Sequence, residues 1–127
     1  MRIKPIKTSE KKTINSYDNQ GFVISGQNYH GSVIVFSDNV TSINLNDISS
    51  LNIQMLAPLE NVTPHIDLLI FGFSNAIEKE LDLSIKDYLI NKKIYLEFME
   101  TGSACRTYNL LLAEERSVAA LLLPCKN

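Results

Sequence analysis

Residues 94–123, IYLEFMETGSACRTYNLLLAEERSVAALLL, place two apolar runs on either side of a segment with helical spacing. The runs IYLEFM (94–99) and SVAALLL (117–123) have the length and composition of buried strands. The segment between them puts its apolar side chains on one face of a helix, namely Ala104, Cys105, Tyr108, Leu111 and Leu112. A strand, a helix and another strand in this order predict a β-α-β unit.

The residues before this unit continue the same pattern. IDLLIFG (66–72) is a nearly continuous apolar run that ends at Gly72, which is typical of a strand buried on both faces. LDLSIKDYLINKK (81–93) has apolar residues at helical spacing, and Ser84 with Asp87 resembles a capping box. The second half of the chain is therefore predicted to run strand, helix, strand, helix, strand.

The first half contains shorter strand-like runs. GFVIS (21–25) and GSVIVF (31–36) are β-branched and aromatic, and GQNYHG between them predicts a hairpin with a long loop. VTSINL (40–45) alternates apolar and polar residues, as a half-buried strand does. Asp47 is expected to cap a short helix that runs to about Met55 and ends before Pro58.

Together these elements predict an α/β fold: a single layered domain around a mixed β-sheet, with an N-terminal hairpin followed by a β-α-β-α-β half. The 127 residues fit one domain over 1–127, in which about residues 1–15 are expected to be mobile. The net charge of −2 gives no basic field to attract nucleic acid.

The sequence also indicates where the protein acts. The first residues lack the apolar core of a signal peptide, and the late apolar run 118–123 is far shorter than a membrane span. We expect a cytoplasmic protein without an integral membrane segment.

Polar residues gather at the start of the second predicted helix. The free amide groups of residues 102–105, with Arg106, would suit an anion, and Thr101 and Ser103 would add hydroxyl donors. Gly72 and Ser74 lie where another predicted strand ends, and if the strands at 66–72 and 94–99 are parallel neighbours, both loops lie at the same sheet edge. The candidate ligand-binding residues are Gly72, Ser74, Thr101, Gly102, Ser103 and Arg106. The alternative is a surface arginine paired with Glu100 or another acid.

No residue is assigned a catalytic role. Cys105 is either a buried small side chain or a nucleophile at a helix N-terminus, and no motif ties it to a base at His30 or His65. The histidines and the two cysteines are too scattered to predict a metal site. The chain has no nucleotide-binding or other cofactor motif, so no cofactor is predicted.

The stretch METGSACRTYNLLLAEERSVAALLLP (99–124) closely resembles the closing signature of a small single-domain family of bacterial and mitochondrial proteins. That family includes mitochondrial complex I assembly factor 3 and the adipogenesis-associated domain protein. GFVISGQNYHGSVIVF (21–36) resembles its first hairpin, and IDLLIFGFS (66–74) resembles its core strand and glycine turn. The chain departs from the family pattern at Phe73 and Ser74, where a second glycine is frequent, and at Glu115, where glycine often follows the helix. The departure at Glu115 implies that the end of this helix is closed differently.

The resemblance implies a bacterial protein with a layered α/β domain and a non-enzymatic function. We expect an interaction or assembly module with one or more protein partners, acting on respiratory or membrane-associated complexes, peripheral to the membrane. Weak homo-oligomerisation is a further expectation. The alternative is a small-molecule or anion binder, or a minor enzyme, that uses Thr101–Arg106. Mitochondrial relatives lack the Cys-Arg part of the signature, which implies that Cys105 and Arg106 serve no function shared by the whole family.

Overall fold

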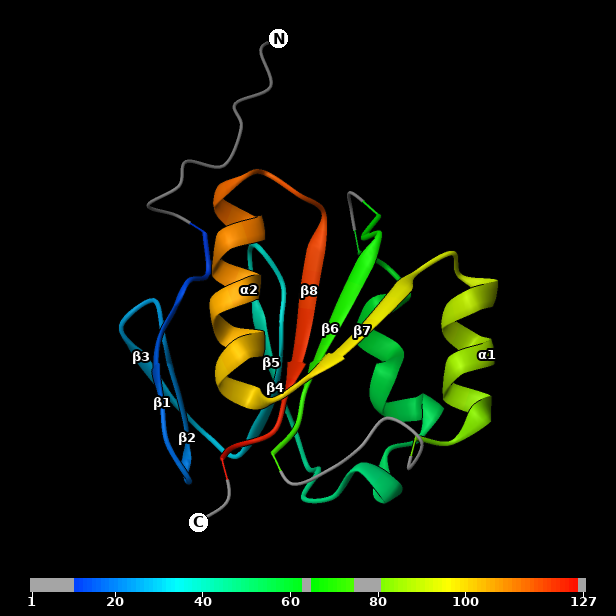
Figure 1. The fold of residues 1–127 in the computed structure, drawn as a ribbon, viewed down its shortest axis with the longest axis horizontal. Coiled ribbons are helices and arrows are strands. Elements are labelled where there is room, and N and C mark those ends of the chain that lie inside the picture. The colour runs from blue at the N-terminus through cyan, green and yellow to red at the C-terminus, as the bar shows by residue number, and fades with distance from the viewer. Residues whose placement is uncertain (1–10, 63–64, 75–80, 126–127) are drawn as a thin grey trace, which may run out of the picture.

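A computed structural model describes residues 11–62, 65–74 and 81–125, which form two β-sheets and the helices around them (Figure 1). The smaller sheet has three strands in the order β1-β2-β3: β1 (Ile14–Tyr17), β2 (Gly21–Ile24) and β3 (Gln27–His30). The larger sheet has five strands in the order β5-β4-β8-β6-β7: β4 (Ser32–Val35), β5 (Val40–Ile43), β6 (Leu68–Gly72), β7 (Tyr95–Met99) and β8 (Val118–Leu122). Residues 14 and 15, which we expected to be mobile, begin β1.

The predicted β-α-β-α-β half is confirmed. It runs through β6, α1 (Leu83–Asn91), β7, α2 (Thr101–Ala113) and β8. Strand β6 pairs in parallel with both β7 and β8, whereas β4 pairs antiparallel with β5 and β8. The five-stranded sheet is therefore mixed, as the sequence predicts.

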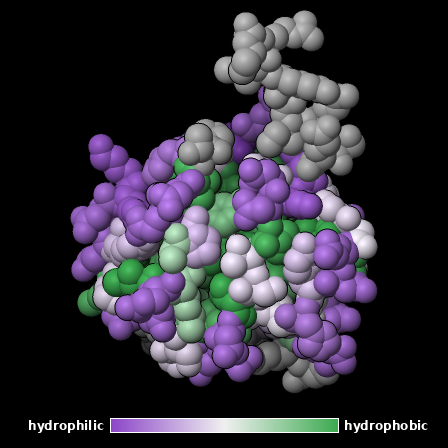
Figure 2. Space-filling view, turned by 180° about the vertical axis from the view of Figure 1, so that it is seen from behind, coloured by the Kyte–Doolittle hydropathy of each residue, from purple (hydrophilic) through white to green (hydrophobic). Residues whose placement is uncertain are grey.

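The larger sheet is covered on both faces, and each face has its own core. Helix α2 and the smaller sheet pack on one face, where Ile70 and Tyr108 belong to one buried cluster. The 3-10 helices η2 (Ile48–Ser50) and η3 (Ile53–Leu59) and helix α1 cover the other face, where Leu69 and Phe71 belong to a second cluster. Successive residues of β6 thus point to opposite cores, which explains its continuous apolar run. From behind, hydrophobic residues reach the surface in patches between hydrophilic ones (Figure 2).

A surface network joins α1 to η3 on this second face. Glu60, which follows η3, accepts a hydrogen bond from the Tyr88 hydroxyl and lies 2.6 Å from the Lys92 amine. The Lys92 hydrogen bond, aided by Tyr88, holds the pKa of the Glu60 carboxyl below its usual value.

The predicted first hairpin is wrong in its pairing. Strand β2 pairs with β3, so the residues expected to form a long loop are themselves a strand. The turn between them consists of Ser25 and Gly26, whose φ angles are 48° and 79°. Two successive residues with positive φ match the right-handed twist of an antiparallel pair, which favours this tight turn over a longer loop. Gly31, with φ 83°, then leads the chain into β4 of the larger sheet.

The single helix expected after Asp47 is also wrong, although Asp47 does act as its predicted cap. The carboxylate of Asp47 accepts from the Ser49 amide, but extended Leu51 ends this first 3-10 turn. A second cap follows, because the Asn52 side chain accepts from the Met55 amide and starts η3. Pro58 lies inside η3, which continues to Leu59 and so runs past the end that the sequence predicted.

The predicted capping box of α1 is not formed. The cap is Asp82, whose carboxylate accepts from the Ser84 amide at 2.9 Å.

The end of α2 is closed by a residue in the left-handed region. Glu115 has φ 62°, its amide donates to the Leu112 carbonyl at 3.0 Å, and the Arg116 amide donates to the Leu111 carbonyl at 3.0 Å. This is the hydrogen-bond pattern of a Schellman motif, in which glycine usually occupies the left-handed position. The helix therefore closes as a glycine would close it, contrary to the different closure that Glu115 led us to expect.

Replacing Glu115 by glycine should stabilise the domain, because glycine adopts positive φ without the steric cost of a Cβ atom. We expect the free energy of unfolding in urea to rise by about 0.5–1 kcal/mol. The matched control is Glu114→Gly at the adjacent C-cap, where φ is −86° and glycine only adds unfolded-state entropy. Equal effects of the two substitutions would contradict this account.

Candidate functional site

The predicted ligand residues meet where α2 begins, at the carboxyl ends of β6 and β7. Because these strands are parallel neighbours, the turn after β6 lies beside the start of α2. The Ser74 hydroxyl donates to the Thr101 hydroxyl oxygen at 3.2 Å. The structure thus brings together two residues far apart in the sequence.

Thr101 is fully buried and its hydroxyl is used internally. It donates to the Leu123 carbonyl at 2.8 Å while accepting from Ser74. One side chain therefore ties the start of α2 to the residue after β8 and to the turn after β6. Its proton already has an acceptor within the protein.

Both glycines of the predicted site allow close packing. A Cβ atom on Gly72 would lie 2.7 Å from the Ala104 Cβ and 2.8 Å from the Leu122 Cδ2. A Cβ atom on Gly102 would lie 2.5 Å from the Tyr17 hydroxyl. Gly72 therefore lets α2 approach the sheet, and Gly102 leaves room for the Tyr17 hydroxyl at the start of α2.

Glu100 occupies the amide groups that the sequence suggested for an anion. It is the N-cap of α2, and its carboxylate accepts from the Gly102 amide at 3.0 Å and the Ser103 amide at 3.3 Å. A carboxylate here satisfies two of the unpaired donors of the helix and interacts favourably with the helix dipole. The anion-site hypothesis consequently takes a specific form, in which an external anion displaces the Glu100 carboxylate.

Arg106 contacts hydroxyl groups. Its guanidinium lies 3.3 Å from the Ser103 hydroxyl and 3.5 Å from the Tyr17 hydroxyl. Within residues 11–62, 65–74 and 81–125, no ion pair joins Arg106 to Glu100 or another acid. Tyr17, which comes from β1, is the residue of this cluster that sequence reasoning missed, since its position depends on tertiary packing.

The buried face of α2 lies behind this cluster. Cys105 is 3% exposed, and burial raises the pKa of its thiol to about 12. The Tyr108 ring is fully buried, and its hydroxyl donates to the Lys12 carbonyl at 3.1 Å. The Asn109 amide accepts from the Ile14 amide at 2.9 Å and donates to the Ile14 carbonyl at 2.8 Å. This face packs the core and holds β1.

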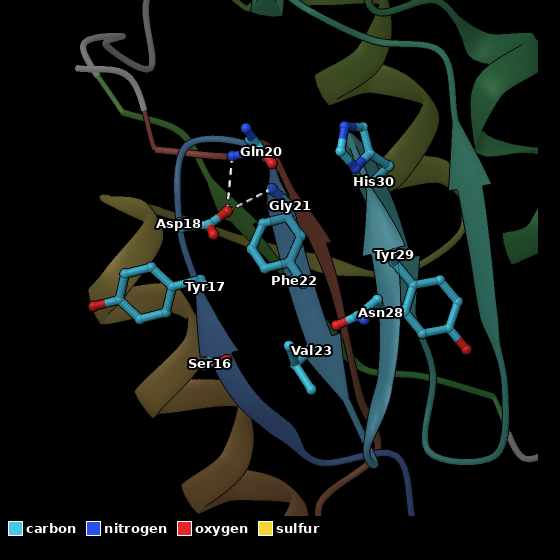
Figure 3. A pocket seen from close by; sticks show the side chains of 10 residues that line it. All are labelled: Ser16, Tyr17, Asp18, Gln20, Gly21, Phe22, Val23, Asn28, Tyr29 and His30. Atoms are coloured by element: carbon cyan, nitrogen blue, oxygen red, sulfur yellow. Dashed lines mark hydrogen bonds between the residues drawn. The ribbon is translucent and has the colours of Figure 1, made fainter.

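A cavity of about 300 Å³ lies beside β1 to β3, and none of the predicted ligand residues lines it. Figure 3 shows Tyr17 and Tyr29 on opposite sides of Phe22, with the Asp18 carboxylate turned toward Gln20 and Gly21. That carboxylate accepts from the Gln20 and Gly21 amides at 2.8 and 3.0 Å, so it shapes the turn between β1 and β2. In the part of the chain that the structure describes, no group of His, Cys, Asp and Glu side chains is placed to hold a metal.

The described residues include no helix with the length and apolar character needed to cross a membrane.

Curated relatives are similar to nearly the whole chain. Complex I assembly factor 3 (NADH dehydrogenase [ubiquinone] 1 alpha subcomplex assembly factor 3) of Xenopus tropicalis is 30% identical over 92% of this chain and 63% of its own length. The protein of the same name from Drosophila melanogaster is 33% identical over 87% of this chain and 58% of its own length. The chain therefore spans about 60% of the length of these relatives.

Solved bacterial structures share the fold. The crystal structure of an outer membrane protein from Bartonella henselae is 30% identical, with a TM-score of 0.80, over 93% of this chain and 98% of that one. The Rpa2829 protein from Rhodopseudomonas palustris is 26% identical, with a TM-score of 0.72, over 99% of this chain and 90% of that one. An Mth938-like domain from Bordetella pertussis, 21% identical over 98% of this chain and 91% of that one, has a TM-score of 0.71 and supports the fold alone.

The family model described as protein of unknown function (DUF498/DUF598) matches residues 14–123. These residues contain both sheets and the strand–helix–strand signature at the end of the chain. The chain belongs to the DUF498/DUF598 family, whose relatives include proteins named complex I assembly factor 3.

Proposed function

We propose that this chain is a non-enzymatic interaction module that assists the assembly of respiratory or other membrane-associated complexes. The observation that carries the proposal is the similarity to complex I assembly factors over 92% and 87% of the chain. A role in assembly is the function that the names of these two curated relatives give. Client proteins and a place of action in the cytoplasm, at the periphery of a membrane, complete the proposal.

The contacts at the start of α2 support a structural role for its polar residues. The Thr101 hydroxyl and the Glu100 carboxylate are both committed to internal hydrogen bonds. Cys105 is buried with a pKa of about 12, so little of it is thiolate at neutral pH, and a nucleophile needs the thiolate form. This end of the fold is better suited to holding the layers together than to turning over a substrate.

Anion binding is the alternative function, and the exposed Arg106 beside the Ser103 hydroxyl favours it. A phosphate or carboxylate would have to replace Glu100 on the amides of Gly102 and Ser103. An anion therefore competes with a carboxylate that is attached to the same helix.

Affinity purification of the tagged chain from its own cells tests the assembly role. We expect reproducible recovery of one or more subunits of a membrane-associated complex, and accumulation of partly assembled forms on native gels when the chain is deleted. The control is the same tag on an unrelated domain of similar size and charge. If no partner is enriched over this control and every complex assembles normally, the assembly proposal fails.

Phosphate binding is tested by thermal unfolding of the wild type and of Glu100→Ala. Because Glu100 holds two amides, we expect phosphate to leave the wild-type melting temperature unchanged and to raise that of Glu100→Ala. Without phosphate, loss of the cap should cost about 0.5–2 kcal/mol.

An anion bound at 100 times its Kd would stabilise the protein by about 2.7 kcal/mol. The double variant Glu100→Ala/Arg106→Ala is the control, because it removes the cation that would face the anion. A wild-type shift that Arg106→Ala abolishes would favour the anion-binding function over a purely structural role for these residues.

Thiol labelling separates the structural and nucleophilic interpretations of Cys105. Burial favours the neutral thiol and raises its pKa to about 12, so the reactive thiolate is scarce at pH 8. We expect Cys125, which is half-buried, to label in the native state and Cys105 to label only on unfolding. Cys125→Ser isolates the Cys105 signal. Native Cys105 that reacts as fast as a free thiol would contradict the structural interpretation.

A further inference from the structure

Among the described residues, β7 is an edge strand of the five-stranded sheet, because it pairs with β6 alone. The Tyr95 amide donates to the Asp67 carbonyl at 2.7 Å, and the Met99 carbonyl accepts from the Phe73 amide at 3.0 Å. In a parallel ladder every second residue faces the neighbouring strand, so the amide and carbonyl groups of Leu96 and Phe98 point away from β6. No described residue hydrogen-bonds to them.

Strand β7 and the neighbouring helix α1 both carry exposed apolar side chains. Tyr95 is 70% exposed on β7, and Leu83 and Ile90 are 71% and 69% exposed on α1. Figure 1 shows α1 beside β7 at the end of the larger sheet. An unpaired strand edge bordered by apolar side chains is a template for another strand.

We propose that β7 pairs antiparallel with β7 of a second copy of this chain, with Leu96 of each copy on the two-fold axis. Leu96 of one copy then exchanges two backbone hydrogen bonds with Leu96 of the other copy. Phe98 lies opposite Ile94, and Tyr95 lies opposite Glu97. The two larger sheets become one continuous sheet.

Charge favours this register and this occupant. Lys93 and Glu97 are both exposed, and Lys93 lies in a turn with φ 60° two residues before β7. Pairing about Leu96 brings this turn of each copy toward Glu97 of the other. The edge is therefore complementary to itself. Pairing about Glu97 would set two carboxylates directly opposite each other, and pairing about Phe98 would place Tyr95 opposite Thr101, which belongs to α2.

The dimer should be weak. A contact built on one five-residue strand and a few neighbouring side chains falls at the small end of specific interfaces, below about 1,200 Å² in total. For an interface of this size we expect a dissociation constant of about 10 µM to 1 mM. The proposal concerns self-association alone and does not depend on the assembly role.

Sedimentation velocity of the purified chain between about 20 µM and about 1 mM is the direct test. We expect the weight-average coefficient to rise from monomer toward dimer with concentration. A coefficient that stays at the monomer value over this range would overturn the proposal.

Leu96→Pro compared with Leu96→Ala tests the backbone edge. Proline removes an amide that points out of the sheet, so the ladder with β6 is retained, whereas alanine removes the same side chain and keeps the amide. We expect Leu96→Pro to weaken dimerisation about tenfold or more relative to Leu96→Ala. Equal dimerisation of the two folded variants would exclude β7 as the interface.

Charge exchange decides the question even if Leu96→Pro fails to fold. Glu97→Lys and Lys93→Glu alter exposed side chains, and each alone creates like-charge contacts across the axis. We expect each variant alone to dimerise about tenfold or more weakly than the wild type, and an equimolar mixture to recover dimer as the heterodimer. Unchanged self-association of both variants, or no recovery on mixing, would overturn the proposed register and the two-fold pairing.

Discussion

Helix α2 lies against the larger sheet at a distance that only glycine permits at residue 72. The Ala104 and Leu122 side chains occupy the space that a Cβ atom there would need. This close approach places Thr101 where its hydroxyl reaches the Leu123 carbonyl and accepts from Ser74. The ends of β6 and β8 and the start of α2 are thus fixed together at one point of the fold.

The position of α2 in turn determines the position of the smaller sheet. Asn109 makes two hydrogen bonds to the backbone of Ile14, and Tyr108 makes one to Lys12. The apolar residues Phe22 and Ile24 of β2 belong to the same buried cluster as Tyr108 and Ile70. A change that moved α2 off the sheet would release both the core beneath it and the strands beside it, so we expect these layers to unfold as one unit.

Sequence reasoning succeeded where burial dominates and failed where local polar chemistry or tertiary contacts dominate. The runs that became β6 and β8 are buried on both faces, so their apolar character reflects their environment directly. Strand β3, in contrast, consists of QNYH and is largely exposed, so it carries no apolar alternation and looked like a loop. The cap of α2 was missed because glutamate is not among the favoured N-cap residues, although its carboxylate reaches the same amides.

The candidate site shows the same division. The meeting of Ser74 with Thr101 follows from parallel strands and could be inferred from the order of the elements. The contact of Tyr17 with Gly102 and Arg106 could not, because it depends on how β1 packs across α2. The polar residues in the first turn of α2 are easily recognised in the sequence. Their hydrogen-bond partners are determined by the tertiary structure.

The paired hydrogen bonds of Asn109 have a consequence for the outer boundary of the smaller sheet. A side-chain amide offers one donor and one acceptor in the geometry of a peptide group, so to β1 it resembles one residue of a neighbouring strand. Strand β1 therefore pairs with β2 on one side, while on its other side the amide and the carbonyl of Ile14 are both bonded to α2. A strand from another molecule cannot pair with this edge of the sheet at Ile14 without first displacing α2. Helix α2, which packs against the core, thereby also prevents polymerisation along this edge.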